Sequence, residues 1–145
     1  LQVRKRQRAV EWGVLALGVL SLAASMGLLS QRRSASATLR QFAASRGEAV
    51  ITSSWILTGD LMPLTANGTP VAWTDDGREL AALMGRLAAR KPVLVTDLSS
   101  SGAAISVARA AGFSPSLLRS VEIDPSLSAG VFGLRPSSAA VPSPR

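Results

Sequence analysis

The clearest candidate for ligand chemistry is a Ser-rich turn that follows a short apolar run. The segment Asp97-Leu98-Ser99-Ser100-Ser101-Gly102 comes directly after Val93–Thr96 and opens a helical pattern. Ligands of parallel α/β sheets bind at the carboxyl ends of strands, where backbone N–H groups and Ser hydroxyls could hold an anion. We therefore take Asp97, Ser99 and Ser100 as candidate ligand-binding residues. The competing interpretation is helix capping, because Ser and Asp are ordinary caps and neither a P-loop nor a dinucleotide fingerprint is present.

A second group of candidate residues is Ser53, Trp55 and Asp60, which lie at the end of another apolar run. Trp55 could stack on a sugar ring or a lipid headgroup, and it could equally fill the core or rest on a membrane surface. No two carboxylates are spaced as an acid–base couple. Since the sequence has no Cys and no His, thiol nucleophiles, Cys/His zinc sites and His-based catalysis are excluded. We predict no catalytic residue, no metal and no cofactor in this chain.

The net charge of +7 is concentrated outside the predicted folded domain. Residues 1–46 carry eight basic side chains and one acidic one, whereas residues 47–136 carry seven basic and eight acidic ones. A nucleic-acid-binding domain needs a basic face with phosphate-contacting side chains on the domain itself. The charge distribution therefore argues against a nucleic-acid partner.

The strongest structural signal is an uncharged apolar segment near the N-terminus. Trp12–Gln31 contains 20 residues, mostly Leu, Val, Ala and Gly, which as a helix would span roughly 30 Å, the thickness of a bilayer core. We predict a membrane-spanning helix over residues 9–31, and the lipid bilayer is the first expected partner. Gly18, Ser21 and Ser25 fall near one face of this helix, which favours close packing against other transmembrane helices.

Basic residues flank both ends of this segment. The cluster at residues 1–8 is denser than Arg32 and Arg33 on the other side, so the positive-inside rule favours a cytoplasmic N-terminus and an extracytoplasmic C-terminal domain. This localises the chain to a cell membrane or inner membrane. A cleavable signal peptide is the rival interpretation, because Ala35-Ser36-Ala37 resembles a cleavage site. The length of the apolar run and the two intervening arginines favour a retained anchor.

The rest of the chain alternates between helix and strand patterns. We expect a linker helix at 32–47, an α/β domain at 48–135 and a disordered Ser/Ala/Pro tail at 136–145. Within the domain, Asp76 with Glu79 matches a capping box for a helix that ends before Pro92. Strands are predicted at Ala49–Leu57, Pro70–Trp73, Val93–Thr96 and Leu117–Ile123, and helices at Asp76–Arg90 and Gly102–Ala111. Strands joined by helices predict the fold class α/β, with a small, Rossmann-like, mostly parallel sheet after one transmembrane helix.

Several stretches resemble the C-terminal part of polytopic GT-C glycosyltransferases, which use sugars linked to polyprenyl or dolichyl phosphate and include mannosyltransferase-like membrane proteins. The resemblance lies in the helix at Arg4–Leu29, in GEAVITSSWI at 47–56 and in TPVAWTDDGRELAALMGRLAARKPVLVTD at 69–97. It implies that this chain is the last membrane helix and external accessory domain of such an enzyme. The family's catalytic acidic residue has no counterpart here, so no catalytic role is carried over. A lipid-linked sugar is the partner that the resemblance implies.

Two other functions compete with this expectation. The chain could be a single-pass membrane protein whose α/β domain is a binding or assembly module without catalytic activity. It could also be an exported domain released by cleavage, which would start near Thr38. Because the sequence begins with Leu1 and not with Met, we expect further residues upstream, and apolar helices there would favour the glycosyltransferase.

Overall fold

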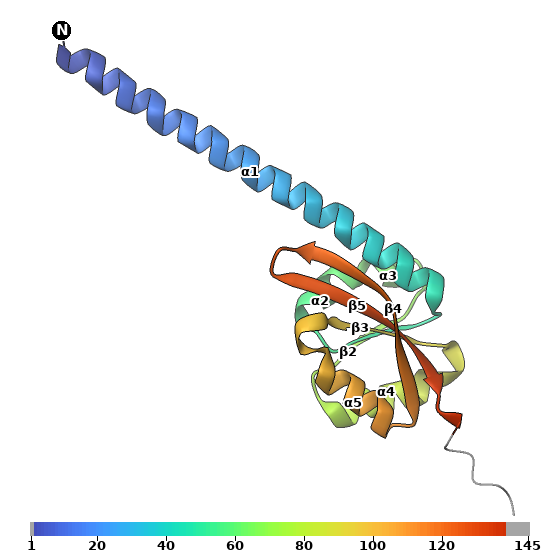
Figure 1. Cartoon of the computed structure of the whole chain (residues 1–145). Helices are drawn as coiled ribbons and strands as arrows, with labels where there is room; N and C mark the ends of the chain where they lie inside the picture. Colours follow the sequence, from blue (N-terminus) through green and yellow to red (C-terminus); the bar gives the residue numbers. More distant parts are fainter. Residues whose placement is uncertain (1, 139–145) are drawn as a thin grey trace, which may run out of the picture. The chain divides into compact units, whose positions relative to one another are not determined.

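The structure of the protein is a computed structural model that describes residues 2–138, with side chains from Val10 onward. Its elements are one long helix, α1 (Gln2–Arg46), and then an α/β arrangement of short helices and five strands within those residues (Figure 1). The chain divides into two units at the boundary between Ser34 and Ala35.

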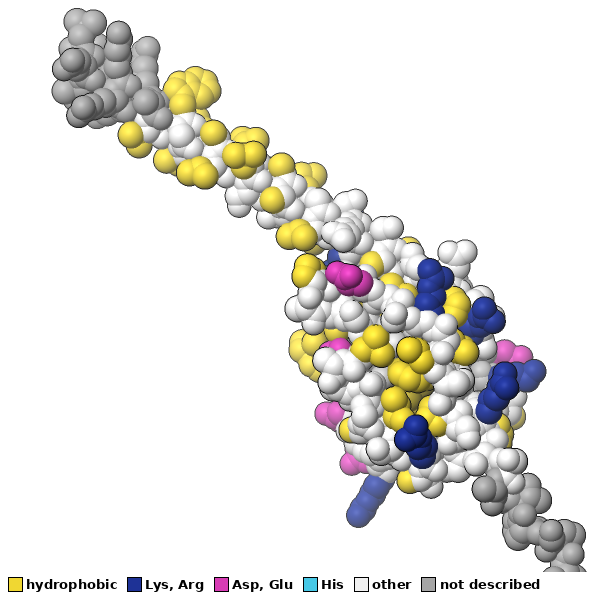
Figure 2. Space-filling model, in the orientation of Figure 1, with side chains coloured by type: hydrophobic (Ala, Val, Ile, Leu, Met, Phe, Trp, Pro, Cys, Tyr) yellow, Lys and Arg dark blue, Asp and Glu magenta, His cyan; other side chains and the backbone are white. Residues whose placement is uncertain are grey.

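The first unit is helical and carries its apolar side chains on the outside. Every large apolar side chain between Val10 and Leu29 is 57–72% exposed, and Figure 2 shows such side chains along this stretch. Among the described residues, this is the one helix that is long and apolar enough to cross a membrane. A helix that is apolar all round is stabilised by lipid or by other helices, not by water. The structure therefore confirms the prediction of a helix that is long and apolar enough to cross a membrane.

The second unit contains a mixed sheet. Within residues 35–138 its strands are ordered β2-β1-β3-β5-β4: β1 (Val50–Thr52), β2 (Val71–Trp73), β3 (Val93–Asp97), β4 (Phe113–Asp124) and β5 (Leu127–Pro136). The pairs β1–β2 and β1–β3 are parallel, whereas β3–β5 and β4–β5 are antiparallel. The α/β class is therefore confirmed, but the mostly parallel, Rossmann-like sheet is not.

The strand that the sequence analysis missed, β5, is the reason for the mixed sheet. It follows β4 after only Pro125 and Ser126, and so short a connection can join only antiparallel strands. Asp124 stabilises this turn, because its Oδ1 accepts from the Ser126 amide at 2.9 Å and from the Ser126 hydroxyl at 2.7 Å. β5 then inserts between β3 and β4.

The predicted strand Ala49–Leu57 is too long. β1 ends at Thr52, whose Oγ1 accepts from the Ser54 amide at 3.2 Å and turns the backbone. The helix α2 (Trp55–Leu61) begins there and buries Leu57 and Leu61 on one side. A run of apolar residues fits a buried strand and a buried helix equally well, and this ambiguity explains the error.

Helices cover both faces of the sheet (Figure 1). One face packs against the last part of α1, α2 and α3 (Pro63–Ala66), with Leu39, Ala43, Leu61 and Leu64 in its core. The other face packs against α4 (Gly77–Leu87) and α5 (Ser101–Ala110), with Leu80, Met84 and Ala108 in its core. Short 3-10 turns, η1 (Ala88–Arg90) and η2 (Leu98–Ser100), extend α4 and precede α5.

The helix predicted at Asp76–Arg90 is confirmed as α4 with η1. The Asp76 carboxylate accepts from the amides of Arg78 and Glu79, so Asp76 is the cap. The capping box is altered, because the Glu79 carboxylate accepts from the Thr74 hydroxyl at 2.8 Å while the Asp76 amide donates to Thr74 Oγ1.

Two predicted regions lie partly outside the described residues. The side chains of the basic flank at 1–8 are among those not described, and so are residues 139–145 of the predicted tail. Pro136, the first residue of that tail, belongs to β5. The linker helix predicted at 32–47 is the last part of α1, which ends at Arg46.

Candidate functional site

The carboxyl ends of β1 and β3 bring part of the two predicted residue groups together. These strands pair in parallel, with Thr52 opposite Val95, so both chains leave the sheet at the same edge. The Ser53 hydroxyl donates to Thr96 Oγ1 at 2.8 Å and joins the two strand ends. Thr96 is buried, and this hydrogen bond satisfies its hydroxyl oxygen.

The predicted turn after β3 is built by Asp97. Its Oδ1 accepts from the Ser99 amide at 2.9 Å and caps η2. Ser99 and Ser100 are exposed, and Ser100 begins α5 without a capping hydrogen bond from its side chain. The Ser101 hydroxyl donates to the Leu98 carbonyl at 3.2 Å. The local hydrogen bonds thus explain Asp97 as a capping residue and leave the two serines available at the surface.

Asp60 has a structural partner in α1. Its Oδ1 accepts from the buried Ser36 hydroxyl at 2.7 Å, and its carbonyl accepts from Arg40 Nη1 at 2.9 Å. These bonds connect α2 with the last part of α1. The Asp60 carboxylate therefore stabilises helix packing and does not join Ser53 and Asp97 at the strand ends.

Trp55 is a surface residue. It is the first residue of α2, and 74% of its side chain is exposed. Trp73, the last residue of β2, is paired with Thr52 of β1 and is also exposed. Ile56 and Met62 are exposed apolar residues as well, and we refer to these four side chains together as the Trp55 surface. Filling the core is thereby excluded for Trp55, and contact with a ligand, a partner or a lipid surface remains.

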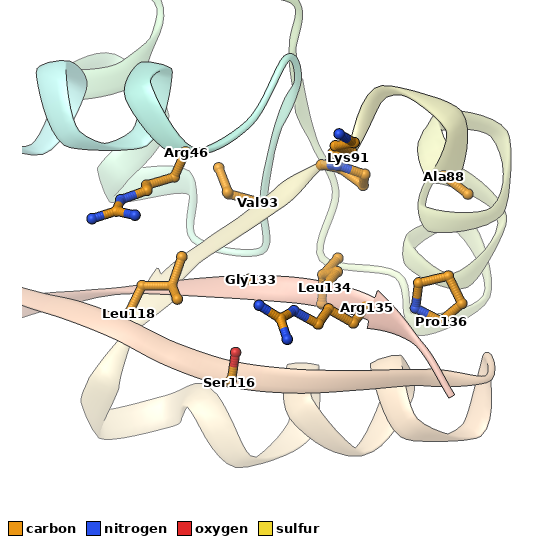
Figure 3. A pocket seen from close by; sticks show the side chains of 11 residues that line it. Arg46, Ala88, Lys91, Val93, Ser116, Leu118, Gly133, Leu134, Arg135 and Pro136 are labelled. Carbon is orange, nitrogen blue, oxygen red and sulfur yellow. The ribbon is translucent and has the colours of Figure 1, made fainter. Parts of the chain in front are cut away.

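A hollow that the sequence analysis did not anticipate lies on the α1-covered face of the sheet. Its volume is about 420 Å³. Figure 3 shows Arg46 and Lys91 on one side and Arg135, Ser116 and Leu118 on the side of β4 and β5. The remaining lining residues are Ala88, Pro92, Val93, Gly133, Leu134 and Pro136. We call this feature the cationic hollow. Its three cations are about 45 residues apart in the sequence, so no local motif could reveal it.

The described residues offer no metal site, because no group of three or more His, Cys, Asp or Glu side chains gathers among them. No family model, no curated protein and no solved structure matches this chain. The candidate sites are therefore interpreted from their own residues.

Proposed function

We propose that this chain is a membrane-anchored accessory domain, the C-terminal membrane helix and extracytoplasmic α/β domain of a glycosyltransferase that uses a lipid-phosphate-linked sugar. The observation that carries the anchor is the stretch Val10–Leu29, whose large apolar side chains are all exposed. Lipid solvates such a surface, and the helix satisfies its own backbone polar groups. The resemblance at 47–56 and 69–97 supports the type of enzyme.

The role in the reaction is accessory and not catalytic. At the strand ends the Asp97 carboxylate caps η2, and the Asp60 carboxylate accepts a hydrogen bond from Ser36 of α1. General acid–base catalysis needs a carboxyl group that can reach a substrate proton. Carboxylates that are committed to capping and helix packing serve the fold instead.

The Trp55 surface is the part suited to a sugar or an acceptor. An indole ring offers a large apolar face with one N–H donor. Trp73 ends β2, and Trp55 begins α2 shortly after the neighbouring parallel strand β1. Ser99 and Ser100 add exposed hydroxyls after β3. A sugar ring has both an apolar face and hydroxyl groups, so it complements this combination.

Anchoring and orientation can be tested together, because the sequence has no Cys and single cysteines can be added freely. In intact cells, a membrane-impermeant maleimide should label Glu122→Cys, an exposed position on β4. Gln2→Cys should react only after permeabilisation. The reverse labelling pattern would show the opposite orientation, and release of the full chain by alkaline carbonate would refute the anchor.

The sugar can be tested with the full chain in lipid nanodiscs. A polyprenyl-phosphate hexose should shift tryptophan fluorescence relative to polyprenyl phosphate alone, and Trp55→Leu should abolish the shift. Trp12→Phe, a change in the membrane segment, is the matched control and should preserve it. Identical spectra with the two lipids would contradict a role in sugar binding.

The second candidate is a single-pass binding or assembly module without catalytic activity. It is favoured by the apolar character of the Trp55 surface, which includes Ile56 and Met62 as well as the two tryptophans. A photo-crosslinking residue at Ile56 distinguishes the two candidates in cells. The glycosyltransferase candidate predicts a lipid adduct, and the assembly candidate predicts an adduct with protein.

A further inference from the structure

The cationic hollow exists because the helical layer is shorter than the sheet it covers. α1 ends at Arg46, while β5 continues to Pro136. On the uncovered part, Ser116 lies opposite Gly133, and Gly133 lies opposite Val93. Residues directly opposite each other share a face of the sheet. Ser116, Gly133 and Val93 therefore form the floor. Leu118 packs over Gly133, since its side chain lies 3.3 Å from the position that a Cβ atom on Gly133 would take.

The rim of the hollow carries three positive charges and no negative one. Arg46, Lys91 and Arg135 line it, and no Asp or Glu is among the lining residues. Within the described residues, none of the three cations pairs with a carboxylate. Arg46 makes a cation–π contact, with its guanidinium 5.2 Å from the centre of the Phe42 ring. Three uncompensated cations around one hollow are complementary to an anion.

The end of α1 opposes this attraction only weakly. The C-terminal carbonyls of a helix act as about half a negative charge, and Arg46 is the last residue of α1. Three full positive charges outweigh that contribution. The field in the hollow therefore favours an anionic ligand.

The backbone at Lys91 provides a second, independent observation. Lys91 has φ 48° and ψ 61°, and it is the only non-Gly residue with positive φ among those described. For a residue with a Cβ atom this conformation costs roughly 1–2 kcal/mol. Glycine would adopt it without strain. A lysine at this corner is strained in the backbone, and Lys91 is one of the residues that line the hollow.

We propose that the cationic hollow binds a phosphate-bearing ligand. Guanidinium groups form paired hydrogen bonds to phosphate oxygens, and an ammonium group adds a point charge. The Ser116 hydroxyl on the floor can donate one more hydrogen bond. A volume of about 420 Å³ exceeds a bare phosphate and falls in the range of small-molecule sites. Leu118, Val93 and Pro136 give that additional space an apolar lining, so the ligand is a phosphate ester with an organic group.

This inference does not depend on the glycosyl-transfer proposal, because the Trp55 surface and the cationic hollow share no residue. Two sources can supply the phosphate ester, a soluble molecule or the headgroup of a lipid. Both offer the same chemistry to the three cations, and the experiment distinguishes them.

The test uses the full chain in nanodiscs of phosphatidylcholine. Phenyl phosphate is titrated and followed by ³¹P NMR as the soluble probe, and nanodiscs with phosphatidic acid, followed by its ³¹P signal, are the lipid probe. Binding of either probe supports the proposal and identifies the source. Loss of one charge-assisted contact should weaken binding about tenfold in Arg135→Gln and in Lys91→Gly.

The variants are chosen so that a folding defect is recognised. Lys91→Gly removes the charge and suits the left-handed backbone, so its thermal unfolding temperature should be unchanged or higher. Arg86→Gln removes one positive charge from an exposed position of α4 that does not line the hollow, and it should leave binding unchanged. Absence of binding to both probes, or an equal loss in Arg86→Gln, would overturn the proposal.

Discussion

At the scale of single residues, Gly47 is required by a close approach of two backbone segments. A Cβ atom built on Gly47 would lie 2.7 Å from the Lys91 carbonyl oxygen. The backbone there must shift to accept a side chain, which costs stability. Gly85 on α4 is the opposite case, because nothing lies within 4 Å of its added Cβ atom.

These two glycines give a matched prediction. Gly47→Ala should lower the free energy of unfolding of the α/β unit by about 1–3 kcal/mol, since backbone cannot move as easily as a side chain. Gly85→Ala should raise it by about 0.5–1 kcal/mol, because alanine favours a helix interior. Thermal unfolding of the full chain in detergent, followed by circular dichroism, measures both. Equal effects of the two substitutions would contradict the close approach at Gly47.

The core position Met84 gives a second prediction at this scale. Its side chain is fully buried, whereas Leu83, which has the same helical periodicity, is only half-buried. Met84→Asp should unfold the α/β unit, because an unpaired buried charge costs about as much as a small domain's whole stability. Ala82→Asp introduces the same charge at an exposed position of α4. Limited proteolysis should degrade the first variant and spare the second, and a protease-resistant Met84→Asp would refute this core assignment.

At the scale of elements, the hydrogen bond between Ser36 and Asp60 joins α1 to α2. The Ser36 side chain is almost completely buried, so its hydroxyl depends on the Asp60 carboxylate at 2.7 Å. Asp60, which the sequence analysis grouped with the candidate ligand-binding residues, therefore holds α1 and α2 together.

A double-mutant cycle over Ser36→Ala and Asp60→Ala should show a coupling free energy of about 1–2 kcal/mol, because a charged acceptor strengthens the bond. Chemical denaturation of the full chain in detergent provides the four free energies. Ser45→Ala, whose hydroxyl bonds only the local Phe42 carbonyl, is the control and should not couple with Asp60→Ala. Additive effects of Ser36→Ala and Asp60→Ala would mean that this hydrogen bond does not stabilise the packing of the two helices.

Some features of the helices and strands are encoded by neighbouring residues, and others depend on distant contacts. The Asp76 cap and the apolar periodicity of α4 are encoded within a few residues, and both are present in the structure. The start of α2 at Trp55 and the end of β1 at Thr52 are not clear from the apolar run that contains them. That run is compatible with both a strand and a helix, and the packing of Leu57 and Leu61 against the sheet favours the helix.

At the scale of the whole molecule, the apolar stretch of α1 is long and apolar enough to cross a membrane. We predict that Leu22→Arg, near the middle of this stretch, lowers the fraction of chain that inserts into membranes. The change should cost roughly 3 kcal/mol of insertion free energy on a biological scale. Resistance of the full chain to alkaline carbonate extraction measures the inserted fraction. Leu22→Ile is the control and should insert normally, whereas equal retention of the Arg variant would argue against a spanning helix.

The features that depend on neighbouring residues could be predicted from the amino-acid sequence alone. Twenty consecutive uncharged residues predict a membrane-spanning helix, because the thickness of a bilayer fixes the number of residues that such a helix needs. The helix α4 and the α/β class follow in the same way from local caps and periodicity. For the candidate site, sequence placed Ser53 and Asp97 at strand ends that are adjacent in the sheet.

Features that depend on the pairing of distant segments became visible only in the folded chain. The position of β5 between β3 and β4 makes the sheet mixed, and no local pattern states which strands will be neighbours. Arg46 ends α1, Lys91 lies in the connection between η1 and β3, and Arg135 belongs to β5, yet all three line the same hollow. Their charges surround one hollow only because packing of the core fixes the distances between these segments. Those distances cannot be read from the linear sequence.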